Sequence, residues 1–332
     1  MKTSLEPRER LVIDRRALLG AIAALPFLGS AACAATAEQP EAPGLHTRII
    51  PGANEAVPVI GIGTARRYQD ATTEEQLATL RETISRFVQL GGRMIDTAPS
   101  YGNAETVIGD LVEGLGVRER LFLATKVAGA TAAEGRTQIE QSFRNLRTEV
   151  LDLIALHNQD DAANKLALLR EYKAQGRVRS IGASISSRAG FGPTDAAIAS
   201  QPEQYAGFEA LMRRERLDAI QVDYALDNRG AAERILPLAQ EQGLAVMVNL
   251  PFGRGRLFQA TEGRPLPDWA GEIGAATWAQ VFLKYIVSHP ARPVAIPGMA
   301  QPRYVEDNLG AARGRMPDAA MRRRMEQYID AL

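Results

Sequence analysis

The sequence predicts a single α/β domain folded as a (β/α)8 TIM barrel. From residue 46 onward, short runs of β-branched and apolar residues alternate with longer stretches of helical periodicity. Eight such units in one chain of 332 residues favour a closed barrel over an open sheet. The alternative, a Rossmann sheet, lacks its fingerprint, because neither the glycines at 61 and 63 nor those at 253 and 255 complete a G-x-G-x-x-G motif.

The eight predicted strands are short apolar runs that stop at Gly, Pro or polar residues. Their alternation with helical stretches indicates a parallel sheet, because a parallel connection needs a crossover helix. We expect the strands at Pro58–Gly63, Met94–Ala98, Leu121–Val127, Leu151–His157, Arg179–Ser184, Ala219–Ala225, Leu244–Pro251 and Pro293–Gly298.

Helices are predicted between these strands. Several end at a glycine (Gly91, Gly176 and Gly243), which is typical of the residue after a helix C-terminus. The connection from Ile185 to about Pro202 is long and rich in Ser, Gly and Ala, so we expect either a lid over the barrel mouth or a surface insertion. The predicted helices include Thr73–Leu90, Arg136–Thr148, Asp161–Gln175, Ala231–Gln242 and Ala275–Ser288.

Residues 1–37 have the pattern of a signal peptide. A charged segment ends in Arg15 and Arg16, an apolar run covers Ala17–Gly29, and small residues follow. The apolar run is shorter than the roughly 20 residues that a membrane-spanning helix needs, which favours a cleaved signal. The paired arginines indicate a twin-arginine signal, with an ordinary secretory signal as the alternative. Residues 38–45 are predicted as a linker, and residues 46–332 as the barrel.

The site of signal cleavage has two interpretations. The sequence Ala35-Thr36-Ala37 fits a small-x-small cleavage site, whereas the residues that end at Cys33 partly resemble a lipoprotein box. Both predict an exported, periplasmic protein that the twin-arginine machinery recognises, without stable membrane insertion of the mature chain. They differ in whether a lipid on Cys33 tethers the chain to a membrane face.

Composition excludes several functional classes. Lys plus Arg and Asp plus Glu each number 39, so no net charge favours nucleic acid as a partner. One Cys excludes an intrachain disulfide framework. The three histidines, at positions 46, 157 and 289, cannot build the multi-His metal centre of many barrel hydrolases, so we expect no metal site.

Four polar residues lie at or just after predicted strand ends, where the active sites of TIM barrels form: Asp96, Tyr101, Lys126 and His157. Each has an ordinary explanation when taken singly. An Asp can cap a helix, a Tyr-Gly-Asn run suits a turn, and a lone His is often structural. A buried Lys is harder to explain, because its charge needs a carboxylate partner. Their placement on three consecutive strand ends predicts a catalytic site.

The run from Gly92 to Asn103, GRMIDTAPSYGN, followed by Lys126 and His157, resembles the aldo-keto reductase superfamily over roughly residues 46–315. The resemblance implies a barrel that binds a nicotinamide dinucleotide in extended form. It also implies that Asp96, Tyr101, Lys126 and His157 match the family's catalytic tetrad. The expected reaction is the reduction of an aldehyde or ketone to an alcohol, or its reverse, by an NAD(P)H-dependent oxidoreductase.

Chemistry supports the same roles independently. Hydride addition to a carbonyl places negative charge on its oxygen, so a donor must deliver a proton there. Tyr101 is the expected acid, and a nearby ammonium from Lys126 would lower its pKa from roughly 10. Asp96 would pair with Lys126, so that the ammonium is not buried alone. His157 would orient the carbonyl oxygen.

The predicted cofactor residues match the family less completely. By resemblance, Ser184 and Gln221 hold the nicotinamide carboxamide, although Ile185 replaces the usual Asn after the Ser. Asn249 stands where relatives have an aromatic residue that stacks on the nicotinamide, so either stacking is lost or Phe252 substitutes for it. The turn formed by Pro251, Phe252 and Gly253 is predicted to contact the cofactor as well.

The segment after the eighth strand is predicted to bind the adenosine phosphates. A helix that begins there suits phosphate binding. Asn308 matches the adenine-contacting Asn of relatives, with Asp307 beside it, but Gly298-Met299 replaces the Lys-Ser pair that many NADPH-specific members use for the 2′-phosphate. Arg303 is the candidate replacement cation. The expected cofactor is NADPH, with NADH as the alternative.

Two functional hypotheses follow. The first is an exported NAD(P)H-linked carbonyl reductase or alcohol dehydrogenase that acts on a small molecule. The second is a weakly catalytic or non-catalytic barrel that binds a dinucleotide or metabolite as a sensor or accessory subunit, which the departures at Ile185, Asn249 and Gly298-Met299 favour. The complete tetrad favours the reductase.

Overall fold

The computed structural model describes residues 44–157, 159–186 and 195–332. Contacts divide the chain into residues 1–42, which lie outside the described part, and the unit that begins at Pro43. None of the helices within the described residues is long and apolar enough to span a membrane. The predicted signal peptide, Cys33 and most of the linker lie outside the described residues.

Eight parallel strands form one sheet with the chain order of a TIM barrel. The first and last strands meet through parallel bridges that join Ile60 to Ala295 and Gly63 to Gly298, so the sheet closes on itself. The strands are β3 (Ile62–Gly63), β4 (Met94–Asp96), β5 (Phe122–Val127), β6 (Leu151–Leu156), β7 (Val178–Ile185), β8 (Ala219–Asp223), β9 (Ala245–Asn249) and β10 (Val294–Ala295). The predicted fold class is confirmed.

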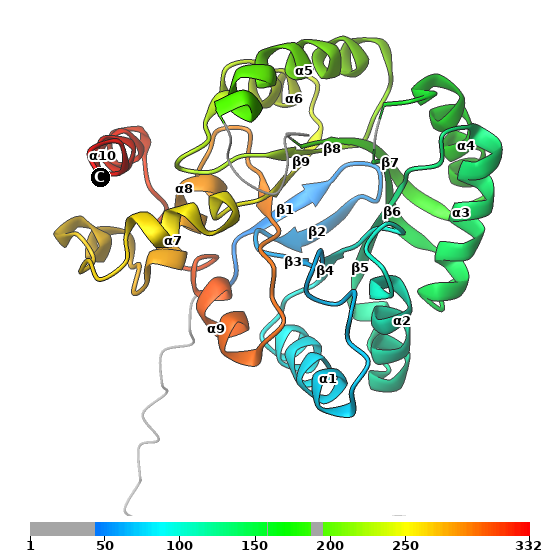
Figure 1. The fold of residues 1–332 in the computed structure, drawn as a ribbon, viewed down its shortest axis with the longest axis horizontal. Coiled ribbons are helices and arrows are strands. Elements are labelled where there is room, and N and C mark those ends of the chain that lie inside the picture. Colours follow the sequence, from blue (N-terminus) through cyan, green and yellow to red (C-terminus); the bar gives the residue numbers. More distant parts are fainter. Residues whose placement is uncertain (1–43, 158, 187–194) are drawn as a thin grey trace, which may run out of the picture. The chain divides into compact units, whose positions relative to one another are not determined.

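Helices follow the strands and surround the sheet (Figure 1). Thr73 and Thr131 cap the helices that begin after them, and Gly91, Gly176 and Gly243 have the positive φ expected beyond helix ends. The helices are α1 (Glu74–Gln89), α2 (Ala104–Leu115), α3 (Ala132–Asn145), α4 (Ala162–Ala174), α5 (Asp195–Arg214), α6 (Ile235–Glu241), α7 (Arg256–Ala260), α8 (Trp278–Val287), α9 (Pro302–Gly310) and α10 (Ala319–Asp330), with short 3-10 turns η1 (Arg118–Arg120), η2 (Gly230–Ala232), η3 (Gly253–Gly255) and η4 (Asp268–Ile273).

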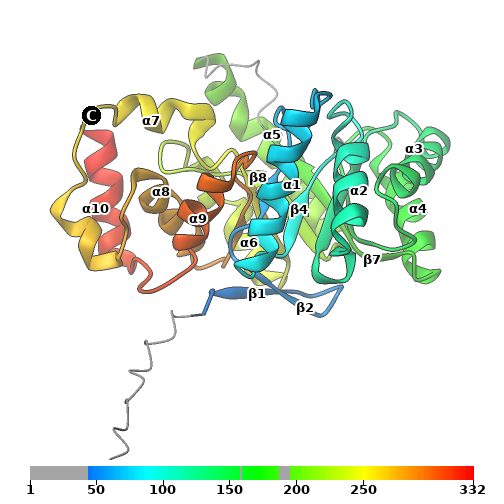
Figure 2. The same cartoon turned by 90° about the horizontal axis from the view of Figure 1, so that it is seen from below.

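An antiparallel hairpin of β1 (Thr47–Ile50) and β2 (Glu55–Pro58) precedes the barrel. Figure 2 shows the hairpin at the end of the barrel opposite the end at which α7 lies. Ile50 and Val57 of the hairpin pack with apolar side chains of the strands, including Met94, Phe122 and Leu153, in a core cluster of their own. The hairpin therefore closes one end of the barrel and leaves the other end for a site.

Two sequence expectations need correction. Pro58, which was predicted to begin the first barrel strand, ends the hairpin strand β2, and β3 begins only at Ile62. The long connection after β7 was predicted as a loop to about Pro202, but α5 begins at Asp195 and contains Pro202. Residues 187–194, which belong to that connection, lie outside the described part.

Candidate active site

The four predicted catalytic side chains meet at the carboxyl ends of three neighbouring strands. Asp96 ends β4, Lys126 lies near the end of β5, and His157 follows β6. Tyr101 lies in the turn between β4 and α2. Its ring centroid is 5.2 Å from Lys126 Nζ and 5.8 Å from the His157 ring centroid, at an interplanar angle of 85°. The sequence prediction that these residues share a site agrees with this geometry.

Asp96 and Lys126 form a buried ion pair. Lys126 Nζ donates to Asp96 Oδ1 at 2.9 Å and to Oδ2 at 2.8 Å, and also to the carbonyl oxygen of Thr97 at 2.9 Å. Burial opposes the charge of Lys126, but Asp96 and Tyr101 outweigh it and raise the pKa of the ammonium. Lys126 is therefore a fixed cation beside the Tyr101 ring.

Burial determines the ionisation of Tyr101. It raises the pKa of the phenol above its usual 10.0, while Lys126 acts in the opposite direction. The sequence predicted that Lys126 would lower the pKa of Tyr101; Lys126 does act in that direction, but the net shift is upward because desolvation is the larger cause. Tyr101 is consequently protonated at neutral pH, as a proton donor must be, and Lys126 is placed to stabilise the phenolate after donation.

His157 is neutral near pH 7. Two causes lower the pKa of the imidazole to about 4: burial is the larger cause and the charge of Lys126 the smaller. Ser100 Oγ lies 3.2 Å from His157 Nδ1, which restrains the ring and leaves Nε2 for another partner. Ser100 was part of the recognised run of sequence but was not assigned a role, because a serine in a turn gives no signal by itself.

Glu105 is a second group that the sequence analysis missed. It lies in the first turn of α2, is buried, and accepts hydrogen bonds from Thr125 at 2.7 Å, Ser142 at 3.2 Å and Asn145 at 3.3 Å. Burial raises the pKa of its carboxyl. Thr125 precedes Lys126, so Glu105 ties the outer face of β5 to α2 and α3 directly behind Lys126. A carboxylate among the apolar positions of α2 was the available signal.

The other side of the mouth, at the ends of β7 to β9, carries the predicted nicotinamide residues. Ser184 Oγ donates to the carbonyl of Leu156 at 2.9 Å, and Gln221 Nε2 donates to Asp96 Oδ2 at 3.3 Å. Asn249 Oδ1 is buried without a hydrogen-bond partner among the described residues. A buried oxygen that lacks a donor suits a ligand with an amide N–H group, such as the carboxamide of nicotinamide.

The turn after β9 has an unusual backbone. Leu250, Gly253, Arg254 and Gly255 all have positive φ, and a Cβ at Gly253 would lie 2.4 Å from Asp227 Oδ2. Burial, followed by the charge of Arg66, lowers the pKa of Arg254. A tight turn beside clustered arginines fits the pyrophosphate of a dinucleotide. Phe252 packs against Phe258 and Phe282, with ring centroids 4.9 Å and 6.4 Å away.

The predicted adenosine residues on α9 separate into different environments. Asn308 is buried at 4% exposure. Asp307 Oδ1 accepts hydrogen bonds from Thr277 Oγ1 at 2.7 Å and Gln280 Nε2 at 3.0 Å, so it joins α9 to the start of α8. Arg303 lies over the ring of Tyr304, with its guanidinium carbon 4.9 Å from the ring centroid, and lines a groove between α1 and α9 with Arg86 and Glu306.

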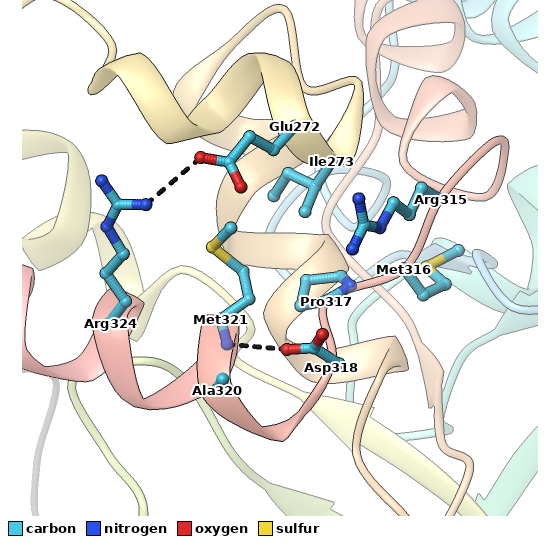
Figure 3. A pocket seen from close by; sticks show the side chains of 9 residues that line it. All are labelled: Glu272, Ile273, Arg315, Met316, Pro317, Asp318, Ala320, Met321 and Arg324. Atoms are coloured by element: carbon cyan, nitrogen blue, oxygen red, sulfur yellow. Dashed lines mark hydrogen bonds and ion pairs between the residues drawn. The ribbon is translucent and has the colours of Figure 1, made fainter.

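A cavity of about 210 Å³ lies between η4 and α10, outside the mouth. Figure 3 shows the ion pair between Arg324 and Glu272 and the cap of α10, in which the Met321 amide donates to Asp318. None of the predicted catalytic or cofactor residues lines this cavity. It belongs to the packing of the C-terminal helix.

The fold and site define a barrel oxidoreductase that acts on carbonyl groups. The chain belongs to the Aldo/keto reductase family, whose pattern it matches over residues 59–328. It is 30% identical over 274 residues to methylglyoxal reductase YeaE of Escherichia coli (strain K12), which covers 80% of this chain and 89% of that protein. An NADH-specific methylglyoxal reductase of the same organism is 26% identical over 204 residues, which are 53% of this chain and 57% of that protein.

Solved structures agree with this assignment. An aldo-keto reductase from Klebsiella pneumoniae in complex with NADPH is 25% identical, with a TM-score of 0.66 over 86% of this chain and 95% of the other. A structure from the same organism with NADP and acetate is 27% identical, with a TM-score of 0.63 over 84% and 93%. The chain is thus an NAD(P)H-dependent carbonyl reductase, as the sequence predicted.

Proposed function

We propose that this reductase acts on small aldehydes or ketones with Tyr101 as the proton donor. The observation that carries the proposal is the position of Lys126, which is held by Asp96 and lies 5.2 Å from the Tyr101 ring centroid. A buried, fixed cation beside a protonated phenol suits a group that must give up its proton and then carry negative charge.

The residues divide the reaction between them. A nicotinamide dinucleotide, when bound at this mouth, would supply the hydride for the carbonyl carbon. Tyr101 gives its phenol proton to the carbonyl oxygen, which becomes the alcohol, and Lys126 stabilises the phenolate until water returns a proton. The neutral His157, restrained by Ser100, orients the carbonyl oxygen through Nε2. Asp96 is a positioning residue that acts through Lys126.

The relatives support a short carbonyl compound as the substrate class. Two of the most similar curated proteins are named as methylglyoxal reductases, so a short carbonyl compound is the first substrate to test. Methylglyoxal, a longer aldehyde and a ketone form a suitable panel. We expect turnover of at least one of them with NADPH or NADH.

The first experiment is a titration of the full-length chain with NADPH and with NADH. The heat of binding measures the affinity directly, and fluorescence quenching of the two tryptophans, Trp269 and Trp278, is a second readout. Micromolar affinity followed by carbonyl turnover supports the reductase. Binding without turnover of any compound would favour a sensor barrel, to which the departures at Asn249 and Gly298 also point. Loss of the cofactor on dialysis would argue against a permanently held dinucleotide.

We also propose that the protein is exported by the twin-arginine route and works in the periplasm. The support is the order of charged, apolar and small residues in positions 1–37, with Arg15 and Arg16 before the apolar run. This route carries folded proteins, so a dinucleotide could travel inside the barrel. Expression in Escherichia coli followed by cell fractionation tests the idea. We expect a periplasmic chain that begins at Glu38, and cytoplasmic retention of the R15K/R16K variant.

A lipid on Cys33 is the alternative processing route. A Cys33→Ala variant distinguishes the two. If cleavage follows Ala37, this variant is processed and released as the parent is. If the parent partitions with membranes and the variant does not, the lipoprotein interpretation holds. Full-length, unprocessed protein in the cytoplasm would contradict both.

A further inference from the structure

Arg67 occupies a defined place beside the barrel seam, where β3 meets β10. The turn that carries it is held on both sides. The Gly63 amide donates to the Pro297 carbonyl at 2.8 Å, and the buried Tyr68 hydroxyl donates to the Met299 carbonyl at 2.9 Å. The Arg67 amide itself donates to the Thr64 carbonyl at 3.0 Å. These bonds fix the backbone of Arg67 against the segment that leads into α9.

The side chain of Arg67 lies over Gly298. A Cβ built on Gly298 would stand 3.4 Å from Arg67 Cγ and 3.6 Å from Arg67 Nε. These are ordinary contact distances, so the arginine stem covers the surface that a side chain at position 298 would occupy. The cation at the end of β10 is therefore supplied from the β3–α1 turn.

The guanidinium of Arg67 has no hydrogen bond or ion pair with any side chain in the described part of the protein. It lines a cavity of about 510 Å³ together with Arg66, Ala300 and Gln301, between the β3–α1 turn and the start of α9. Asp70 and Glu75 also line the cavity, and Asp70 accepts a hydrogen bond from Gln69 at 2.9 Å. An available cation on a fixed turn can bind an anionic group without first breaking a protein contact.

Arg303 is less suited to that role. Its guanidinium lies over the Tyr304 ring and donates to the Tyr304 hydroxyl at 3.1 Å. It lines the outer groove in which Arg86 pairs with Glu306. A phosphate there would meet the carboxylate of Glu306 as well as the arginines.

We propose that Arg67 recognises the 2′-phosphate of NADPH and sets the preference of this enzyme for NADPH over NADH. This inference rests on the proposed reductase function, because it assumes that a dinucleotide binds at the carboxyl ends of the strands. The two dinucleotides differ only in that phosphate, so a residue that contacts it changes the affinity for one and leaves the other unaffected.

The test is the affinity of the full-length chain for NADPH and NADH, measured by isothermal titration calorimetry, in the parent and in Arg67→Gln. A charge-assisted contact predicts a loss of about tenfold or more in NADPH affinity. NADH affinity should stay within about twofold, which also shows that the variant is folded. Arg303→Gln, which removes the other candidate cation of this region, is the competing arm. A tenfold loss of NADPH affinity in Arg303→Gln, with Arg67→Gln unchanged, would overturn the assignment to Arg67.

A second variant tests the geometry. In R67Q/G298K, a lysine at position 298 enters the space that Arg67 covers, and we expect it to restore much of the lost NADPH affinity. An equal loss of affinity for both dinucleotides in R67Q would place Arg67 on the pyrophosphate and overturn the assignment. So would a parent that binds both but does not depend on Arg67. A parent that binds neither dinucleotide would overturn the reductase proposal and this inference with it.

Discussion

The two sides of the barrel mouth differ in how completely their polar groups are paired within the protein. On the side proposed to be catalytic, at the ends of β4 to β6, Asp96 and Lys126 are buried and bonded to each other, and Tyr101 and His157 pack beside them. On the cofactor side, at the ends of β9 and β10, Asn249 Oδ1 lacks a partner in the described part and four residues between 250 and 255 have positive φ. Proton transfer needs a donor and a cation held at fixed positions by protein contacts. Cofactor binding can instead be achieved by different residues at the same place.

The largest expected effect is on the catalytic side. Tyr101→Phe removes the proton donor without changing the ring, so turnover should fall by about 100-fold or more. NADPH affinity should change by less than about twofold, because the phenol is not expected to hold the cofactor. Steady-state kinetics and fluorescence titration measure the two quantities. Turnover within tenfold of the parent would show that Tyr101 is not the acid.

The ion pair behind Tyr101 gives the next effect. Lys126→Met leaves Asp96 buried without its partner, which should cost about 3–5 kcal/mol in the free energy of unfolding. Asp96→Asn should also be destabilising, because it leaves the Lys126 ammonium buried without its carboxylate partner. The double variant D96N/K126M buries no charge, so we expect most of the stability to return while turnover stays low. Urea unfolding followed by circular dichroism is the measurement. A double variant that is as unstable as the sum of the singles would mean that the pairing contributes little.

A smaller effect is expected on the cofactor side. Asn249→Ala removes an oxygen that we expect to accept a hydrogen bond from the cofactor, so the affinities for NADPH and NADH should both fall by roughly three- to tenfold. The stability of the free protein should not fall, because the oxygen has no partner among the described residues to lose. If both affinities are unchanged, the nicotinamide does not use this strand end.

The smallest effect concerns pH. Burial raises the pKa of Tyr101 and lowers that of His157 to about 4, so both stay in one protonation state near neutrality. The turnover of carbonyl reduction should therefore vary by less than about twofold between about pH 5.5 and 8. Alcohol oxidation, which needs the phenolate, should rise with pH. A midpoint near 6.5 that His157→Gln removes would show that His157 titrates at its ordinary value.

The lowered pKa of His157 also makes the free energy of unfolding depend on pH. The unfolded chain takes up the imidazole proton below pH 6.5, whereas the folded chain takes it up only below about 4. The contribution of His157 to folding stability is therefore present above pH 6.5 and is lost as the pH falls through that interval. Comparing the parent with His157→Gln over this range isolates the contribution.

Sequence patterns predicted the barrel and its strands, because these depend on local periodicity and on where apolar runs stop. The same patterns located the four polar residues at strand ends that the structure brings together, and their catalytic roles remain a prediction. Predicted and observed ranges of β6 differ by one residue. The start of α3 lies four residues before the predicted Arg136, since Thr131 caps it. The β1–β2 hairpin was not predicted, because it is stabilised by packing against distant strands.

The cofactor side was harder to predict. The positive φ values at Leu250 and Arg254 carry no composition signal, because residues of these types rarely adopt them. Arg67 contacts position 298 across the β3–β10 seam, although the two residues are 231 positions apart in the sequence. Local sequence patterns cannot predict such a long-range contact. Ser100 and Glu105 act through neighbours that only the fold brings near.

The seam between β3 and β10 also constrains synthesis. Gly63 pairs with Gly298, and a Cβ at Gly63 would stand 2.5 Å from the Ile296 carbonyl oxygen, so the two strands meet closely. Until the ribosome has released residues 294–298, β3 has no neighbour on that side and presents an exposed edge to other nascent chains. The barrel can close only after β10 has left the ribosome, so a chaperone that covers the free edge of β3 until then would protect the nascent barrel from aggregation.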